Sequence, residues 1–241
     1  MLITLIHPSF RRPRLAPKAY RQWMEASSGE NQIQYILSLD NRDPLLNHYL
    51  NYTRGRDYEV LISDNHSVVD ATNVAAKQAK GDVFIYMSDD FEASKGWDNQ
   101  IVNFVKENNL EGKPYLLRAN DNYQSQFELL TVPIMSKELY QELGYFWHPK
   151  YRSMFVDNDL FHLTEQMGVQ YDARQHIHFT HQHPHNPNST SNVDLTYKQS
   201  HSNWSQGESL FVDRCIEMGW DAKNERLMKL VEIRKNNAKL A

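Results

Sequence analysis

The feature of the sequence that most constrains the fold is the alternation, in its first half, of short apolar runs with stretches of helical periodicity. Each apolar run stops at polar or turn-forming residues, and we expect strands at Leu2–Ile6, Gln34–Leu39, Tyr58–Ser63 and Val83–Met87. Helices are expected at 15–27 and at Val68–Ala79, the second with Ser67 as its N-cap and Gly81 as its stop. This alternation predicts an α/β fold in which helices flank both faces of a mostly parallel sheet.

The pattern changes past residue 115. Strands are expected at Tyr115–Leu117 and Leu129–Ile134, and helices at Lys137–Leu143, Asp157–Met167 and 224–240. The last helix is charged and amphipathic, and we expect it to dock against the body of the protein. Residues 200–214 are polar enough for a mobile lid that orders over a bound ligand and excludes water.

Polar side chains follow every strand expected in the first half. They are His7 and Ser9, Asp40, Asp64 and Asn65, and the triplet Ser88, Asp89 and Asp90. Open α/β sheets bind ligands beyond the carboxyl ends of their strands, so these residues predict the position of a site. Two adjacent carboxylates suit a hard divalent cation that bridges phosphate oxygens. Taken alone, however, such a triplet is more often an ordinary loop after a strand.

Composition excludes several classes of protein. The formal net charge of −4 argues against binding to nucleic acid through bulk electrostatics. Cys215 is the only cysteine, which excludes an intramolecular disulfide and a zinc site built from several cysteines. The apolar start of the chain is too short for a signal peptide, and no later run approaches the roughly 18 apolar residues of a membrane span. We therefore expect a cytoplasmic protein with no membrane span.

Four segments, in the right order and at the right spacing, resemble the inverting family 2 glycosyltransferases, which have the GT-A fold. Residues 7–13 (HPSFRRP) are similar to the family's Pro-x-Tyr-Asn-Arg turn, and Leu37–Asn41 stands where the family has an acidic turn that contacts uracil. Residues 65–90 resemble the series Asn-x-Gly, Ala-Arg-Asn, Ala-x-Gly and an apolar strand ending in Asp-x-Asp. Residues 136–160 resemble a segment that ends in Glu-Asp-x-Asp-Leu.

The resemblance covers residues 1 to about 168, which it identifies as a nucleotide-sugar-binding and catalytic core. Residues 169–241 would then add a histidine-rich segment, the lid and the docking helix to the same domain, as a C-terminal helical extension. Four positions depart from the family pattern: Ser67 replaces a glycine, Thr72 an arginine, Ser88 the first Asp of the metal motif, and Val156 a glutamate. These changes affect the donor sugar more than the reaction class.

The resemblance implies a metal-dependent, inverting transfer of a sugar from a nucleoside diphosphate, with UDP as the expected carrier. The residues implied to bind the nucleotide sugar are Pro8, Ser9, Arg12, Asp40, Asn65, Asn73, Ser88 and Asp89. Asp90 is implied to hold Mn²⁺ or Mg²⁺ at the diphosphate, and Asp157 to act as general base. Asp157 and Asp159 also suit a structural role as caps of the helix that begins there.

Five histidines occur within residues 176–185. If this segment is extended, His181, His183 and His185 share one face. Enzymes with the GT-A fold often complete their metal site with a late histidine, so the resemblance makes His181 or His183 the candidate second ligand. Most of these histidines are equally well explained as loop residues without a ligand, and a zinc site made of histidines alone is a more distant alternative.

Other functions remain open from the sequence. A nucleotidyltransferase shares the α/β layout and a carboxylate metal site, but residues 7–10 lack the glycine-rich phosphate loop expected after its first strand. A catalytically silent module that binds nucleotide or sugar is the second alternative. The acceptor is unidentified: a glycan, a protein, a lipid-linked sugar and a modified DNA base all fit. The basic residues Arg11, Arg12, Arg14, Lys18 and Arg21 suit a diphosphate, a polyanionic acceptor or a solvated helix face.

Overall fold

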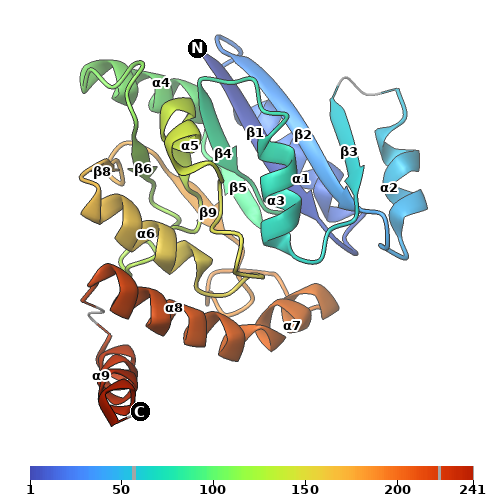
Figure 1. Ribbon diagram of the computed structural model, residues 1–241. Coiled ribbons are helices and arrows are strands. Elements are labelled where there is room, and N and C mark those ends of the chain that lie inside the picture. The colour runs from blue at the N-terminus through green and yellow to red at the C-terminus, as the bar shows by residue number, and fades with distance from the viewer. Residues whose placement is uncertain (56–57, 222–223, 241) are drawn as a thin grey trace.

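The structure is a computed structural model that describes residues 1–55, 58–221 and 224–240. Within this part of the chain a seven-stranded sheet forms the centre, with the strand order β3-β2-β1-β4-β7-β6-β8 (Figure 1). Its strands are β1 (Leu2–Ser9), β2 (Gln32–Asp40), β3 (Glu59–Ser63), β4 (Val83–Tyr86), β6 (Leu116–Arg118), β7 (Ile134–Ser136) and β8 (Gln170–Asp172). A separate pair joins β5 (Phe91–Ala93) to β9 (Phe179–His181).

Strand direction confirms the expected mostly parallel sheet. The strands β1, β2, β3 and β4 pair in parallel, and β8 pairs in parallel with β6. Only β7 runs against its neighbours, because it is antiparallel to both β4 and β6. The carboxyl ends of the other six strands in the sheet therefore meet at one edge, which is where an open α/β sheet binds its ligands.

Helices cover both faces of the sheet (Figure 1). They are α1 (Leu15–Ala26), α2 (Leu46–Thr53), α3 (Val68–Ala76), α4 (Trp97–Glu107), α5 (Lys137–Leu143), α6 (Val156–Gln166), α7 (Leu195–Ser202), α8 (Trp204–Met218) and α9 (Glu225–Leu240). Side chains of β1 alternate between two hydrophobic cores. Leu5 packs with Trp23 of α1 and Trp97 of α4, whereas Ile6 packs with Val69 of α3 and Leu160 of α6.

The start of α3 confirms a local prediction, while its end corrects one. Ser67 is the N-cap, and its hydroxyl accepts a hydrogen bond from the backbone N–H of Asp70 at 3.0 Å. The helix ends at Ala76, earlier than expected, so Gly81 is not its stop. Gly81 instead lies against β1, where an added Cβ would come within 2.7 Å of the Thr4 hydroxyl oxygen. Glycine is required there by close packing of two backbone segments.

A further strand boundary is corrected, and the segment expected to form a lid is helical; its movement over a ligand stays a prediction. Residues 129–133 are not a strand, and β7 begins only at Ile134. The polar segment 200–214 is largely helical: α8 packs Phe211, Val212 and Cys215 into the core that it shares with α6. Polar residues recur along the helix, with Ser205, Gln206 and Asp213 exposed, while the apolar residues above face the core, so α8 is amphipathic.

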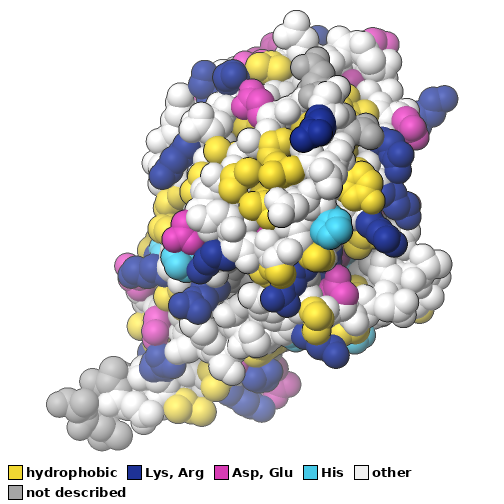
Figure 2. All heavy atoms as spheres, turned by 90° about the vertical axis from the view of Figure 1, so that its right-hand side faces the viewer, with side chains coloured by type: hydrophobic (Ala, Val, Ile, Leu, Met, Phe, Trp, Pro, Cys, Tyr) yellow, Lys and Arg dark blue, Asp and Glu magenta, His cyan; other side chains and the backbone are white. Residues whose placement is uncertain are grey.

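Within the described residues, no helix is both long enough and apolar enough to cross a membrane. Figure 2 shows one face of the molecule, on which Lys and Arg side chains are spread among acidic and uncharged ones. Arg11, Arg14, Lys18 and Arg21 are exposed, which fits a solvated helix face, whereas Arg12 is only partly exposed and turns toward the interior.

Candidate active site

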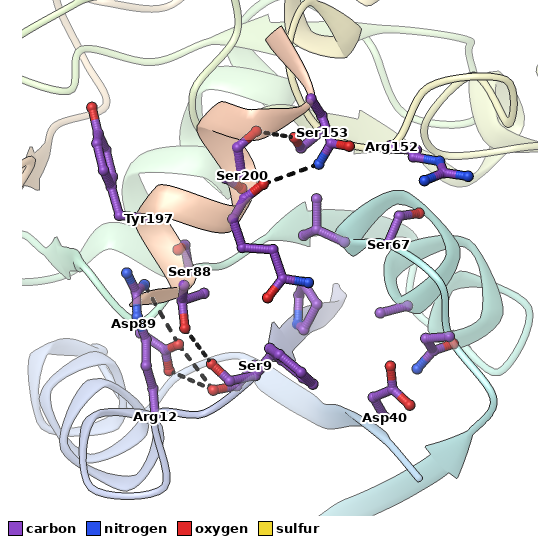
Figure 3. A pocket seen from close by; sticks show the side chains of 18 of the residues that line it. Ser9, Arg12, Asp40, Ser67, Ser88, Asp89, Arg152, Ser153, Tyr197 and Ser200 are labelled. Atoms are coloured by element: carbon purple, nitrogen blue, oxygen red, sulfur yellow. Dashed lines mark hydrogen bonds and ion pairs between the residues drawn. The ribbon is translucent and has the colours of Figure 1, made fainter. Parts of the chain in front are cut away.

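A cavity of about 560 Å³ opens beyond the carboxyl ends of β1, β2, β3 and β4 (Figure 3). Residues after these strands form its floor and sides, and α7 contributes the opposite wall. From the strand ends it is lined by Pro8, Ser9, Phe10, Arg12, Asp40, Arg42, Asn65, His66, Ser67, Tyr86, Ser88, Asp89 and Asp90, and from the second half by Arg152, Ser153, Thr196, Tyr197, Gln199, Ser200 and Asn203. Seven of the eight residues expected to bind a nucleotide sugar thus lie around one cavity.

Asp89 is fully engaged by neighbouring side chains. Its carboxylate accepts hydrogen bonds from the Ser9 hydroxyl at 2.9 and 3.0 Å, and one oxygen lies 3.1 Å from His7 Nε2. Arg12 Nη1 lies 3.9 Å from the other oxygen. Only 3% of the Asp89 side chain is exposed. A buried carboxylate with this many partners organises the strand ends around it, and Figure 3 shows Ser9, Arg12 and Asp89 gathered on one side of the cavity.

Asp90 is more available to a ligand. One carboxylate oxygen accepts a hydrogen bond from the Ser88 hydroxyl at 2.7 Å, and the other lies 3.7 Å from His181 Nε2. A fifth of the side chain is exposed, and the residue lines the cavity. Burial would raise the pKa of Asp90, but His181, Ser88 and the charge of Arg12 outweigh it and hold that pKa well below its usual range. Asp90 is therefore ionised at every working pH.

His181 reaches Asp90 because β9 pairs with β5. The register sets His181 opposite Phe91, the residue after Asp90, and the two rings stack at 4.1 Å. The other ring nitrogen, Nδ1, lies 3.5 Å from Asp121 Oδ2. Burial lowers the pKa of His181, but the carboxylates of Asp121 and Asp90 outweigh it, so that pKa is raised.

Asp121 is a site residue that the sequence analysis did not identify. It is fully buried, and one carboxylate oxygen accepts hydrogen bonds from the backbone N–H groups of Tyr123, Gln124 and Ser125 at 2.7 to 3.0 Å. The other accepts from the Thr131 hydroxyl at 2.9 Å. Asp121 follows β6 at the ligand-binding edge of the sheet, and this was the signal available in the sequence.

His183 lies beside His181 but does not line the cavity. Its ring stacks on Tyr123 with centroids 5.1 Å apart, and its Nε2 lies 3.4 Å from the hydroxyl of Tyr197. Burial and the positive charge of His181 lower the pKa of His183 to about 4, so its imidazole is neutral near pH 7. The segment is not extended beyond His181, because β9 ends there and His183 and His185 lie in irregular backbone, so the condition for a shared face of the three histidines is not met.

The donor set for a cation is small. Within the described residues, no group of three or more His, Cys, Asp or Glu side chains is arranged to hold a metal ion. Asp90 and His181 nevertheless offer one carboxylate oxygen and one imidazole nitrogen at the cavity wall. Divalent cations at phosphate sites are commonly held by one or two carboxylates together with substrate oxygens and water. The pair fits such a cation if a bound diphosphate supplies further ligands.

Asp40 and Asn65 shape the far side of the cavity. Asp40 pairs with Arg42 at 3.0 Å, and Arg42 also lies 3.1 Å from Asp64 and donates to the Asn65 carbonyl. The buried Asn65 amide donates to the Leu39 carbonyl at 3.1 Å and accepts from Ser63 at 3.0 Å. Asn65 therefore fixes the turns after β2 and β3, while 13% of the Asp40 side chain remains exposed at the cavity.

Asn73 is the exception among the expected nucleotide-sugar-binding residues. It does not line the cavity. Its side-chain oxygen accepts hydrogen bonds from the backbone N–H groups of Phe146 and Trp147, and its amide donates to the Trp147 carbonyl at 2.7 Å. Asn73 thus fastens the loop before α6 to α3, which is a structural role.

Arg12 joins the floor of the cavity to the wall made by α7. Its guanidinium forms two hydrogen bonds with Asp194, at 2.7 and 3.0 Å, and Asp194 is the N-cap of α7. The Thr196 hydroxyl donates to the Phe10 carbonyl at 2.9 Å, and the Ser153 hydroxyl to the Ser200 carbonyl at 3.1 Å. Tyr197 and Arg152, which the sequence analysis also missed, reach the cavity from this wall and from the loop before α6.

Asp157 lies in the first turn of α6, and its neighbour Asp159 has a different environment. Burial raises the pKa of Asp157 to about 6, although the carboxylate accepts a hydrogen bond from the backbone N–H of Asn158 at 3.1 Å. Asp159 is buried and accepts hydrogen bonds from Tyr151 at 3.0 Å and Arg214 at 2.9 Å. Two side chains therefore hold Asp159 in place, whereas the hydrogen bonds to Asp157 come from backbone N–H groups. Asp157 does not itself line the cavity.

No protein family profile and no curated protein sequence matches the chain. Its structure is similar to that of S. aureus TarS 1–349 in complex with UDP, with a TM-score of 0.59 at 11% identity over 96% of this chain and 70% of that one. The same fragment in complex with UDP-GlcNAc gives 0.59 at 12% identity, over 96% and 71% of the two chains. The chain spans 36% of the longer TarS chain, which it matches at 12% identity over 75% of its own length with a TM-score of 0.54.

The structure is also similar to glucosyl-3-phosphoglycerate synthase from Mycobacterium tuberculosis in complex with Mn²⁺, UDP and phosphoglyceric acid. Here the TM-score is 0.55 at 11% identity, over 89% of this chain and 78% of that one. At these identities the likeness concerns the fold, and it confirms the expected GT-A fold.

Proposed function

We propose that the protein transfers a sugar from a nucleoside diphosphate, UDP, to an acceptor hydroxyl. The observation that carries the proposal is the cavity at the carboxyl edge of the parallel strands, where Asp40, Asn65 and Asp90 converge from three strand ends. Neighbours with the same fold were solved with UDP, UDP-GlcNAc, or UDP and Mn²⁺, which supports a nucleotide sugar as the ligand. The cavity volume of about 560 Å³ suits a ligand of this size.

In this proposal Asp40 and the turn that contains Pro8 and Ser9 hold the nucleoside. Arg12 supplies positive charge to the diphosphate. Asp90 and His181 would hold Mn²⁺ or Mg²⁺, which when bound neutralises negative charge on the leaving diphosphate. Asp89 contributes indirectly, because its contacts with His7 and Ser9 fix the backbone on which Asp90 and Arg12 are mounted.

Asp157 acts as general base. Its carboxylate takes the proton from the acceptor hydroxyl, whose oxygen forms a bond to the anomeric carbon as the bond from that carbon to the phosphate oxygen breaks. Attack on the face opposite the leaving group inverts the anomeric configuration. The raised pKa of about 6 supports this role, because a base that titrates near the working pH combines the correct protonation state with useful basicity.

One observation favours a second candidate, a nucleotide-sugar-binding protein without transferase activity. The pair Asp90 and His181 is a small ligand set, and Ser88 stands where the resembled family has a further carboxylate. Hydrolysis of the bound nucleotide sugar separates the two functions, because glycosyltransferases commonly transfer slowly to water in the absence of acceptor. Release of free UDP that is lost in Asp157→Asn supports the transferase, and stable binding without release supports the second candidate.

Thermal stabilisation by nucleotide sugars tests the donor site. UDP-, GDP-, CMP- and dTDP-sugars are added with and without Mn²⁺ to the wild type and to Asp90→Ala. A ligand that binds the native state raises the melting temperature by mass action. We expect a rise with UDP-sugars that requires Mn²⁺ and is lost in Asp90→Ala. The absence of any rise, for every nucleotide, would contradict the proposal.

A further inference from the structure

A second cavity, of about 730 Å³, lies outside the nucleotide site. Six parts of the chain surround it: the end of β6, the loop 126–129, α6, the loop after β8, the first half of α8, and the start of α9. In Figure 1, α6 and α8 run side by side and α9 follows at the end of the chain. The cavity is lined by Arg118, Gln126, Phe127, Glu128, Leu129, Phe155, Asn158, Phe161, His162, Glu165, Arg174, Trp204, Glu208, Phe211, Asn224, Arg226 and Leu227.

The two cavities are neighbours on either side of a thin wall. Ser153 and Asn203 line the first cavity, and Phe155 and Trp204, two and one positions later, line the second. The rings of Phe155 and Trp204 meet edge to face at 5.0 Å. Asp157 lines neither cavity, but Phe155 and Asn158, which flank it in the sequence, line the second one. A ligand in the second cavity would therefore contact the turn of α6 that carries the proposed general base.

Aromatic rings form one side of the second cavity. Phe127 is 55% exposed and Trp204 is 37% exposed, although large apolar side chains are usually withdrawn from water. Both line the same cavity, with Phe155 and Phe211 buried behind them. Exposed aromatic rings gathered in one concave surface indicate a ligand with apolar patches, such as the C–H faces of a sugar ring.

The charged residues of the second cavity carry planar groups, and both positive and negative charges are present. The described lining residues include three arginines and three glutamates, whose formal charges cancel. Arg226 pairs with Glu208 at 2.9 Å, and Arg118 is held by the carbonyls of Ser125 and Phe127 at 2.9 and 3.1 Å. Carboxylates and guanidinium groups present paired acceptors and donors that match adjacent hydroxyls. The balance of charge favours an uncharged, hydroxyl-rich ligand over an anionic one.

We propose that the second cavity binds an uncharged oligosaccharide, and that the acceptor of the transferase is a saccharide whose chain extends into this cavity. The second half of this statement rests on the proposed function. The binding itself does not, because it depends only on the aromatic rings and planar polar groups that line the cavity.

The test measures binding by isothermal titration of the full chain with maltotetraose, cellotetraose and chitotetraose up to about 10 mM, the range expected for weak saccharide sites. We expect at least one to bind the wild type. Phe127→Ala should weaken that binding about tenfold or more, as loss of an aromatic anchor does. Tyr52→Ala, which removes a 42% exposed aromatic residue on α2, is the matched control and should leave it unchanged.

Failure to bind any of the three tetrasaccharides, or binding that Phe127→Ala leaves unaltered, would overturn the inference. Tight binding of tripolyphosphate that depends on Arg118, without saccharide binding, would also overturn it. That result would show that the cavity binds anions. The UDP-sugar stabilisation assay is run on the same samples. Tetrasaccharide binding without any nucleotide response supports the cavity assignment while the proposed transferase function fails, so the two ideas are separable.

Discussion

Asp90 Oδ2 and His181 Nε2 lie 3.7 Å apart, although β4 and β9 are in different sheets. The pairing of β5 with β9 brings them together, and the backbone N–H of Gln182 donates to the Asp90 carbonyl at 2.8 Å. The separation is longer than a good hydrogen bond. Each side chain therefore keeps bonding capacity for a third group, which the proposal identifies as a divalent cation.

Replacing His181 by alanine should weaken Mn²⁺ binding in the presence of UDP by about tenfold or more, because the cation loses one of its two protein ligands. Titration of Mn²⁺ followed by electron paramagnetic resonance measures the affinity. His185→Ala is the matched control, since His185 is exposed and does not line the cavity. If His183→Ala lowered the Mn²⁺ affinity and His181→Ala did not, His183 would be the second ligand in place of His181.

Asp157→Asn should lower kcat by about 10² to 10⁴, the range that general-base catalysis contributes, and leave UDP-sugar affinity unchanged. In the wild type, kcat should rise with pH through about 6, because the carboxyl must lose its proton before it can accept one and burial holds its pKa there. The pH profile of kcat measures both. Asp213→Asn, at an exposed position on α8, serves as control. A profile without an inflection near that pH would exclude Asp157 as the base.

The same carboxyl makes a prediction about stability. Its pKa is raised from 3.8 to about 6, so the folded state binds its proton more tightly than the unfolded state does. Stability from this group is present below the unfolded pKa and is lost as the pH rises through the folded one. Asp157→Asn should therefore raise the melting temperature near neutral pH and have little effect below about pH 4. An equal effect at both pH values would show that ionisation is not its cause.

The first half of the site could be predicted from the sequence because it depends on local signals. A buried parallel strand is a short apolar run with a definite end, and the end places its polar residues at the ligand-binding edge. Asp40, Asn65 and Asp90 were identified this way. Helix α5 was predicted with its observed bounds, since Ser136 caps it and Gly144 ends it in a left-handed conformation.

The second half depends on contacts between distant segments. Residues 129–134 read as a strand, yet only β7 at Ile134–Ser136 forms one, and the Thr131 hydroxyl instead donates a hydrogen bond to the buried Asp121 carboxylate. The same carboxylate, with Arg118 and Arg174, also binds the backbone of Gln124 and Ser125 earlier in this loop. Likewise β5 and β9 are only three residues each, and nothing in either sequence segment indicates that the two strands pair. Tertiary contacts decide such short elements, and local propensity does not.

Asp121 is expected to position His181. Its carboxylate accepts hydrogen bonds from three backbone N–H groups. Burial raises the pKa of Asp121, but the interaction with His181 and these backbone bonds outweigh burial and lower that pKa to about 2. Asp121→Asn should weaken Mn²⁺ binding about tenfold, the usual effect of losing the partner of a metal-binding histidine. It should also lower the free energy of unfolding by about 1 to 3 kcal/mol. Metal titration measures the Mn²⁺ affinity, and chemical denaturation measures the free energy of unfolding.

A merely structural Asp121 would lower stability and leave the Mn²⁺ affinity of the folded protein unaltered, so the metal titration decides the matter. Asp172→Asn is the comparison, because Asp172 is an exposed carboxylate that also pairs with one cation, Arg174, and is the last residue of β8 in the same sheet. It should alter neither quantity appreciably.

Gly207 is expected to be irreplaceable for a reason that opposes helix propensity. It lies within α8, where alanine is favoured over glycine by about 1 kcal/mol. An added Cβ, however, would collide with the backbone carbonyl of Met154, which cannot turn aside as a flexible side chain can. Overpacking of this kind typically costs about 1 to 3 kcal/mol. The cost of the collision should exceed the gain in helix propensity, so Gly207→Ala should destabilise the protein.

The wall between the two cavities makes this variant informative about function as well. Met154 lies between Ser153 of the first cavity and Phe155 of the second, so a shift of α8 away from it moves Asn203 and Trp204 together. Gly207→Ala should therefore lower the melting temperature by a few degrees and also weaken both UDP-sugar and tetrasaccharide binding. Ser205→Ala, at an exposed position in the same helix, should do neither. If Gly207→Ala were instead more stable than the wild type, α8 would not rest on Met154, and the description of the two cavities as neighbours across that contact would be wrong.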